Sequence, residues 1–305
     1  MSVPEVVVRA PAKINLSLAV GGPRRDGFHD VATVYHAVSL FDDVTARPAD
    51  RVEVSVTGPQ AGDVPLGRDN LAARAARLLA RRAGIEDGVH LTISKGIPVA
   101  GGMAGGSADA AAALVACDAL WRTGLARNDL RELAAELGSD VPFCLLGGTA
   151  VGTGRGEQLT PALARGEYHW VVALAGFGLP TPKVYGELDR LRSGRVLPEP
   201  RVSDELMKAL RSGDAEALGR ALDNDLQPAA CSLAPTLERT LAVGRDYGAL
   251  GGVVSGSGPT IVFLARDTEH ALDLAVALTA SGTVRDVRRV RGPVPGARVV
   301  EPVRA

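Results

Sequence analysis

Cysteine, aromatic residues and net charge are all scarce in this sequence of 305 residues. Its three cysteines, Cys117, Cys144 and Cys231, lie far apart with no CxxC pair, which argues against a disulfide framework or a zinc site and fits reduced thiols in a cytoplasm. A formal net charge of −1 and an aromatic content of 4% give little basis for binding nucleic acid or an anionic membrane. We therefore expect neither partner, and any phosphate recognition must be local.

Long apolar runs and a leader pattern are also missing. The first eleven residues carry Glu5 and Arg9 within a short valine run, so we expect no signal peptide. No apolar run approaches the length needed to cross a bilayer. With 46% hydrophobic and 23% charged residues, the chain is expected to be a soluble, cytoplasmic protein with two domains of ordinary size.

Strand patterns dominate the beginning of the chain. From Lys13 to Leu18, apolar side chains alternate with Lys13, Asn15 and Ser17, which share the opposite face. Asn70 is a plausible N-cap for a first helix. The predicted strands are 5–9, 13–20, 33–41, 43–47, 51–57 and 89–95, with a loop at 21–29; the predicted helices are 70–82, 107–120 and 129–137.

The composition changes after Gly156, where a connector at 158–167 is expected to lead into a second domain. We therefore predict domains at 1–160 and 161–305. The second domain should be an α+β layer, followed by a loose tail from Gly292 onward. Its predicted strands are 170–175, 252–255, 260–264 and 284–291; its predicted helices are 204–210, 214–222, 234–247 and 268–280.

A glycine-rich stretch, Pro98 to Ala108, follows a predicted strand and opens into a helix. Its small residues leave successive N–H groups free to point at one anion, and the helix N-terminus adds partial positive charge. A flexible turn is the alternative; a Walker A loop or a dinucleotide fingerprint does not fit the spacing. The predicted phosphate cradle comprises Pro98, Val99, Ala100, Gly101, Gly102, Met103, Ala104, Gly105, Gly106, Ser107 and Ala108.

Two charged residues could assist phosphoryl transfer in the absence of a Walker lysine. Lys13 is unusual in an apolar strand, although an edge strand could simply point it to water. Asp140 lies just past a predicted helix end, where capping of a short following helix is the alternative role. Neither residue decides the function by itself.

Five motifs, occurring in one order, resemble the GHMP kinases, and the resemblance covers nearly the whole chain. It implies an α+β, two-domain fold: an N-terminal β-rich α/β domain with a glycine-rich phosphate loop, a C-terminal ferredoxin-like α+β domain and an active site between them. The segment from Lys13 to His29 resembles the branch that phosphorylates 4-diphosphocytidyl-2-C-methyl-D-erythritol, in non-mevalonate isoprenoid synthesis. The motifs are Pro11-Ala12-Lys13-Ile14-Asn15-Leu16, Asp26-Gly27-Phe28-His29, the Pro98–Ala108 loop, Gly138-Ser139-Asp140-Val141-Pro142 and Ser255-Gly256-Ser257-Gly258-Pro259.

This resemblance implies roles for individual residues, with ATP and Mg²⁺ as cosubstrate and cofactor. Asp140 would accept the proton of the substrate hydroxyl, and Lys13 would keep Asp140 ionised. His29 would contact cytosine, with Phe28 as a wall of the pocket. The remaining implied site residues are Asn70 near the adenine, where helix capping explains it almost as well, and Asn15, Thr181, Ser257 and Gly258 on the substrate side. The turn at 255–258 could also be a plain hairpin turn. No carboxylate is assigned to the metal, which the Ser107 hydroxyl could touch.

The sequence departs from the family pattern at a few positions and leaves alternatives open. Met103-Ala104 stands where Leu-Gly is more usual, and Ala104 limits φ; Phe28 replaces a tyrosine; and Asp109 is expected to cap the helix. A homoserine- or mevalonate-type kinase remains an alternative, although the motif at 26–29 argues against it. A silent nucleotide-binding protein is another, although intact Lys13 and Asp140 argue against it. The chain could be a monomer or a homodimer.

Overall fold

The computed structural model describes residues 4–99 and 101–304, with the backbone alone at 301–304. A long antiparallel hairpin, β1 (Glu5–Pro23) and β2 (His29–Ala49), organises the first part of the chain. We predicted four shorter strands here, but β-bulges after Pro11 and Asn15 let the pair bend without ending. The predicted loop at 21–29 is therefore only a short turn between the two strands.

The hairpin lies within an eight-stranded sheet of order β12-β1-β2-β4-β3, in which β5 also pairs with β2 and β6, and β8 runs parallel to β1. The tail after Gly292, predicted to be loose, instead forms β12 and pairs antiparallel with the start of β1. The remaining strands of this sheet are β3 (Glu53–Thr57), β4 (Gly88–Ser94), β5 (Thr149–Thr153), β6 (Gln158–Pro161), β8 (Asp223–Asn224) and β12 (Arg298–Arg304).

Four helices pack beside this sheet. The central helix, α2, is rich in alanine, and Ala110 to Ala113 are fully buried. Because alanine side chains are short, α2 lies close to both α1 and β1, which places its N-terminus beside the middle of the hairpin. The helices are α1 (Leu71–Ala83), α2 (Gly105–Trp121), α3 (Arg127–Leu137) and α4 (Val141–Leu146), with a 3₁₀ turn, η1, at Ala61–Asp63.

A second, four-stranded antiparallel sheet has the order β11-β7-β10-β9. Numbered along the chain, this is 4-1-3-2, the ferredoxin-like order that was predicted. Helices α5 and α8 were not predicted. The strands are β7 (Tyr168–Leu174), β9 (Gly251–Val254), β10 (Ile261–Ala265) and β11 (Asp286–Gly292); the helices are α5 (Thr181–Leu191), α6 (Asp204–Ser212), α7 (Ala215–Arg220), α8 (Gln227–Leu233), α9 (Thr236–Asp246) and α10 (Thr268–Ala280). The domain division at residue 160 stays a prediction, and β8 and β12 return to the first sheet.

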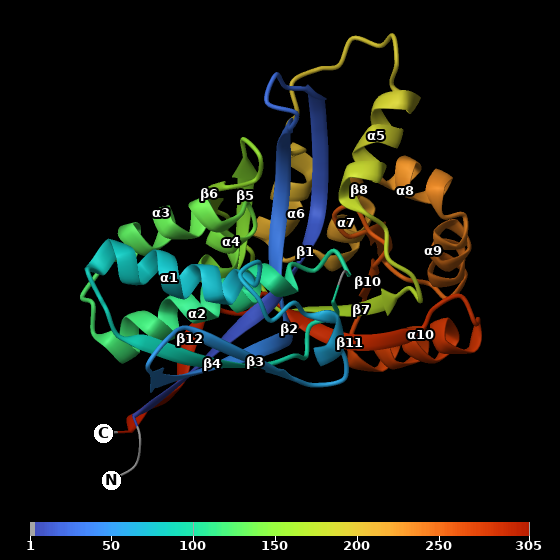
Figure 1. Ribbon diagram of the computed structural model, residues 1–305. Helices are drawn as coiled ribbons and strands as arrows, with labels where there is room; N and C mark the ends of the chain where they lie inside the picture. Colours follow the sequence, from blue (N-terminus) through green and yellow to red (C-terminus); the bar gives the residue numbers. More distant parts are fainter. Residues whose placement is uncertain (1–3, 100, 305) are drawn as a thin grey trace.

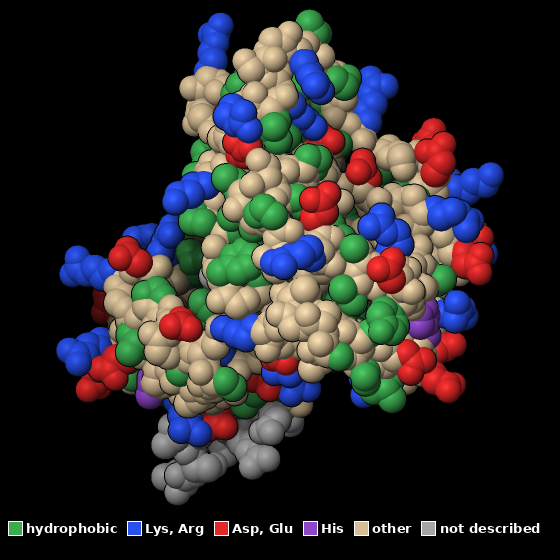
Figure 2. Space-filling model, turned by 90° about the vertical axis from the view of Figure 1, so that its right-hand side faces the viewer, with side chains coloured by type: hydrophobic (Ala, Val, Ile, Leu, Met, Phe, Trp, Pro, Cys, Tyr) green, Lys and Arg blue, Asp and Glu red, His purple; other side chains and the backbone are tan. Residues whose placement is uncertain are grey.

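The β1–β2 hairpin rises between two groups of helices, α1 to α4 on one side and α5, α8 and α9 on the other (Figure 1). Acidic and basic side chains are interspersed on the face that Figure 2 shows, without a broad area of one sign. Within the described residues, no helix combines the length and the apolar character that crossing a membrane requires.

Candidate active site

The predicted phosphate cradle connects β4 to α2 and borders a cavity of about 280 Å³. Residues 101–106 form one wall, and Val64 and Pro65 line the cavity as well. Ser107 lies in the first turn of α2, where backbone N–H groups have no partner inside the helix. Ala100 lies outside the described residues. The described part of the cradle thus places the N-terminus of α2, with its first-turn N–H groups, beside an open space, while the Val99 N–H donates to Gln60 Oε1 at 3.1 Å.

Backbone geometry makes two positions of this loop special. Gly102 has φ +69°, and a Cβ there would lie 2.9 Å from the carbonyl oxygen of Ser255. Only glycine therefore allows the two glycine-rich turns to touch. Ala104 precedes α2 with φ 60°, in the left-handed region that costs an alanine roughly 1–2 kcal/mol. Alanine was expected to restrict φ at this position, and Ala104 instead adopts the strained left-handed conformation.

A buried ion cluster lies beneath the loop and was not predicted. Lys95 Nζ contacts Asp42 Oδ2 at 2.5 Å and Asp109 Oδ2 at 2.9 Å. Asp42 Oδ1 also accepts hydrogen bonds from the backbone N–H groups of Gly96 and Ile97. Asp109, expected to cap α2, instead ties this helix to the end of β4. We call these three charged residues the Lys95 corner.

Electrostatics in the Lys95 corner are governed by burial, since the three side chains are at most 5% exposed. Burial and the neighbouring charge of Asp42 raise the pKa of Asp109 to about 8. Burial opposes the charged form of Lys95, but the charges of Asp109 and Asp42 raise the pKa of this lysine. A Cβ at Gly105 would lie 3.2 Å from Lys95 Nζ, so the ammonium group lies directly under the first turn of α2.

Lys13 is buried rather than pointed to water, which excludes the edge-strand alternative. Its ammonium group donates a hydrogen bond to Asn15 Oδ1 at 2.7 Å, and Asn15 donates in turn to Thr33 Oγ1 at 2.8 Å. The backbone N–H of Lys13 donates to the Met103 carbonyl oxygen at 3.2 Å. This bond joins β1 directly to the phosphate loop and fixes the position of the lysine relative to it.

Asp140 faces Lys13, with 3.8 Å between Oδ2 and Nζ. It occupies the N-cap position of α4, but its side chain makes no capping hydrogen bond. Burial, followed by the negative charge of Asp140, raises the pKa of Tyr35 well above its usual range. The Tyr35 ring also lies 5.7 Å from Lys13 Nζ, so Asn15, Asp140 and Tyr35 all surround the ammonium group. The Asp140 side chain is 31% exposed, so its carboxylate is partly accessible beside a fixed cation.

The second glycine-rich turn, Ser255 to Gly258, faces the same region. A Cβ at Gly256, which has φ +58°, would lie 3.3 Å from Lys13 Nζ. Asn224 supports the turn by donating hydrogen bonds to the carbonyl oxygens of Val254 and Gly256. Ser257 Oγ lies 2.8 Å from Thr181 Oγ1 at the start of α5. The turn does more than reverse the chain, because it brings the second sheet against Lys13.

His29 lies at the far end of the hairpin, in a contact between β2 and α5. Its Nε2 lies 2.9 Å from Asp189 Oδ1, and its ring centre lies 4.9 Å from that of Tyr185. Burial and the charge of Asp140 raise the pKa of Tyr185 to about 12, which keeps its hydroxyl protonated near neutrality. Phe28 is 51% exposed, with the Arg155 guanidinium 5.2 Å above its ring.

Asn70 has the capping role that the sequence indicated. Its Oδ1 accepts hydrogen bonds from the N–H groups of Ala72 and Ala73, and its amide group donates to the Pro65 carbonyl oxygen at 2.8 Å. Pro65 lines the cavity at the phosphate loop. Asn70 thus fixes one wall of that cavity, whereas its proximity to an adenine stays a prediction.

Sequence reasoning missed several residues of the site. Their partners lie far away along the chain: Lys95 is 53 residues from Asp42, and His29 is 160 residues from Asp189. The available indication for Lys95 was a charge directly after an apolar strand and directly before the glycine loop. The missed residues are Tyr35, Asp42, Lys95, Tyr185, Asp189 and Asn224.

Comparison with protein families gives two matches within the chain. Residues 70–148 match the N-terminal domain of the GHMP kinases, and residues 206–283 match their C-terminal domain. Among solved structures of lower identity, a homoserine kinase from Cytophaga hutchinsonii aligns with a TM-score of 0.73 at 21% identity, over 97% of each chain. A mevalonate kinase from L. major aligns with a TM-score of 0.72 at 16% identity, over 94% of this chain and 95% of its own. These two structures share the fold.

Relatives of much higher sequence identity show to which family within the GHMP kinases the chain belongs. A 4-diphosphocytidyl-2-C-methyl-D-erythritol kinase from Streptomyces avermitilis is 59% identical, over 97% of this chain and 99% of its own length. A protein of the same name from Thermobifida fusca is 58% identical, over 97% and 98%. A solved 4-(cytidine 5'-diphospho)-2C-methyl-D-erythritol kinase aligns with a TM-score of 0.76 at 35% identity, over 94% of this chain and 98% of its own. The chain therefore belongs to the GHMP kinases and, within them, to the family of the 4-diphosphocytidyl-2-C-methyl-D-erythritol kinases.

Proposed function

We propose that this protein transfers the γ-phosphoryl group of ATP to the 2-hydroxyl of 4-diphosphocytidyl-2-C-methyl-D-erythritol. The observation that carries the proposal is the placement of Lys13 and Asp140. Their charged groups lie 3.8 Å apart, and the Lys13 backbone is bonded to the phosphate loop. A transferring phosphoryl group needs a nearby cation and an acceptor for the proton of the attacking hydroxyl, and this pair supplies both.

The proposed reaction is a single displacement. The substrate oxygen forms a bond to the γ-phosphorus, the bond between that phosphorus and the oxygen bridging to the β-phosphate breaks, and ADP leaves. The Asp140 carboxylate accepts the hydroxyl proton, while the Lys13 ammonium group beside it offsets charge on the transferring group. The contact of Lys13 with Asn15 fixes the ammonium group, so that little reorganisation is needed during the reaction.

ATP would lie along the phosphate loop, with its phosphates at the N-terminus of α2 and its adenine toward Val64 and Pro65. No group of three or more histidine, cysteine, aspartate or glutamate side chains in the described residues is arranged to hold a metal. Mg²⁺ would therefore be held chiefly by the nucleotide phosphates, with the Ser107 hydroxyl in reach, as is common for this ion. When bound, it neutralises charge on the β- and γ-phosphates.

The cytidine end of the substrate would lie near His29, between the hairpin and α5. Three features support this placement: the His29 ring is held by Asp189, Tyr185 lies beside it, and Phe28 is exposed nearby. Thr181, Ser257 and Gly258 would border the substrate between the two sheets. The cytoplasmic location and the choice between monomer and homodimer stay predictions.

The decisive experiment measures ADP release with Mg²⁺ and ATP on the cytidine substrate, with homoserine and mevalonate in parallel. We expect turnover on the cytidine substrate alone and a rate lower by roughly 10²–10⁴-fold in Asp140→Ala. Thermal unfolding of the variant is the control: Asp140 makes no capping bond, but it is the ion-pair partner of the buried Lys13, so the rate is compared at a temperature at which the variant is folded. Turnover on another alcohol would reassign the substrate, and an unchanged rate in the variant would remove Asp140 from the mechanism.

A further inference from the structure

The outer face of α1 carries a groove that the proposed reaction does not use. Residues 68–82 contain five arginines and a single acidic residue, although the whole chain has a formal net charge of −1. Four of these arginines line a cavity of about 600 Å³ between α1 and α3, a volume typical of small-molecule sites. We call this cavity, with Arg68, Arg74, Arg77 and Arg81, the arginine groove.

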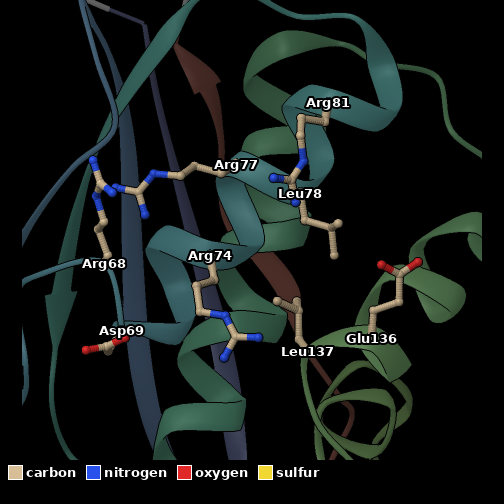
Figure 3. Close-up of a pocket in the computed structure, with 8 residues that line it drawn as sticks. All are labelled: Arg68, Asp69, Arg74, Arg77, Leu78, Arg81, Glu136 and Leu137. Atoms are coloured by element: carbon tan, nitrogen blue, oxygen red, sulfur yellow. The ribbon is translucent and has the colours of Figure 1, made fainter.

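All four arginines line the groove, and in Figure 3 the guanidinium groups of Arg68 and Arg77 lie beside each other, with those of Arg74 and Arg81 farther along it. Arg74, Arg77 and Arg81 follow a spacing of three and four residues, which places them on one face of α1. Arg68 comes from the segment before the helix, and its guanidinium group points toward that of Arg77. The two acidic residues of the lining, Asp69 and Glu136, make no ion pair with any of the four within the described part of the chain.

A neighbouring arginine shows that acidic partners were available to this helix. Arg82 contacts both Asp129 and Glu132 of α3, at 3.0 and 3.9 Å. Arg68 and Arg77, by contrast, approach each other, and neither has an ion pair with any other residue that the structure describes. Like charges that converge without a counter-ion repel each other, so the arrangement costs free energy unless an anion binds between them.

Guanidinium groups favour a particular class of anion. Their planar N–H groups match the oxygens of phosphate in bidentate fashion, and a linked row of phosphates can engage several of them together. Arg74 and Arg81 are seven residues apart, about 10 Å along the helix axis. A single phosphate cannot bridge that distance, whereas a chain of phosphates comes closer to doing so. We infer that the arginine groove binds an oligophosphate, either a free inorganic chain or the phosphate tail of a nucleotide.

The groove is separate from the cavity at the phosphate loop. The two cavities share none of their lining residues and lie at different parts of the α1 region: Val64 and Pro65 line one, and Arg68 and Asp69 line the other. The inference therefore does not rest on the proposed function. It does place a second anion site beside the helix that Asn70 caps.

The test is a calorimetric titration of the full chain with sodium tripolyphosphate at two salt concentrations. The groove variant is Arg74→Gln/Arg77→Gln, and the matched control, Arg82→Gln/Arg211→Gln, removes the same number of charges outside the groove. Glutamine has a helix propensity similar to that of arginine, so both variants should fold, as thermal unfolding would verify. We expect tripolyphosphate affinity to fall by about 10- to 100-fold in the groove variant, to stay within about twofold in the control, and to weaken in high salt.

Two further titrations identify the source of the phosphates. Inorganic phosphate should bind at least about tenfold more weakly than tripolyphosphate, because it engages fewer guanidinium groups. An ATP binding event lost only in the groove variant would assign the site to nucleotide tails; unchanged ATP binding beside lost tripolyphosphate binding would assign it to free chains. Equal tripolyphosphate affinity in the groove variant and the control would overturn the inference, as would phosphate binding as tightly as tripolyphosphate.

Discussion

The two ends of the proposed active site are built in different ways. In the Lys95 corner, the side chains of Lys95, Asp42 and Asp109 are 3%, 0% and 5% exposed. At the other end, the buried His29 pairs with an Asp189 side chain that is 41% exposed, and the neighbouring Phe28 is 51% exposed. Water can replace a lost partner at the His29 end, whereas the Lys95 corner offers no such replacement.

This difference assigns different tasks to the two ends. The Lys95 corner joins β2, β4 and α2, so its charges hold together the turn that carries the phosphate loop. The His29 contact joins β2 to α5, across the boundary between the two sheets. A buried charge whose partner is removed is costly, while an exposed pair contributes little to stability. We therefore expect the Lys95 corner to govern folding and the His29 end to govern substrate affinity.

The largest expected effect comes from Lys95→Met. This change leaves the buried Asp42 carboxylate without its cation and the Asp109 carboxyl group without its partner, so the free energy of unfolding should fall by about 3–5 kcal/mol. Urea unfolding followed by circular dichroism measures the loss, with the exposed Lys208→Met as control. A loss of less than about 1 kcal/mol, the usual size for an exposed ion pair, would mean that the Lys95 corner contributes no more to stability than a surface pair does.

A smaller effect, over the range from pH 6 to pH 8, is expected from the protonation of Asp109. Its pKa is raised to about 8, above its value near 4 in the unfolded chain, so the folded state binds the extra proton. The contribution to stability is therefore complete below pH 4 and is lost as the pH rises toward 8, at up to about 1.4 kcal/mol per pH unit.

The variant Asp109→Asn isolates this contribution because its amide resembles the protonated carboxyl group. Between pH 6 and pH 8, the urea midpoint of the wild type should fall more steeply than that of the variant. The exposed Asp273→Asn should keep the slope of the wild type. Parallel slopes for the wild type and Asp109→Asn would show that Asp109 is ionised throughout this range.

The smallest effect on stability is expected at the other end, from Asp189→Asn. The free energy of unfolding should change by less than about 1 kcal/mol, because the carboxylate is partly solvated. KM for the cytidine substrate should nevertheless rise several-fold, since the hydrogen bond that orients His29 is weakened, while KM for ATP stays constant. Asp246→Asn, on the exposed end of α9, is the control. Equal changes in the two KM values would contradict the separation of the ends.

Local patterns predicted the fold where neighbours in sequence determine the structure. The helix at 268–280 and the cap at Asn70 were both predicted correctly, because each depends on a few adjacent residues. The helix at 181–191 was missed, although Pro182 in its first turn is a favourable position for proline. The strand at 298–304 follows several prolines and glycines, and its conformation depends on β1, at the opposite end of the sequence.

In the site, too, local patterns were predicted and contacts between residues distant in sequence were missed. Motifs predicted the phosphate loop and drew attention to Lys13 and Asp140, and the structure places these elements beside one another. The prediction for Asp109 was wrong because its position two residues after Ser107 resembles a helix cap. Its partner, Lys95, lies on the other side of the glycine loop, and no local pattern reveals that a folded turn brings the two together.

The pairing of β12 with β1 has a consequence for synthesis of the protein. The first strand leaves the ribosome early, but the strand that covers its edge at residues 5–9 follows only after nearly the whole chain. At synthesis rates of about 5–20 residues per second, that edge stays uncovered for about 15–60 s. Unpaired strand edges invite pairing with other chains. The second sheet, whose strands all lie between residues 168 and 292, is available earlier, so the sheet begun first is the one completed last.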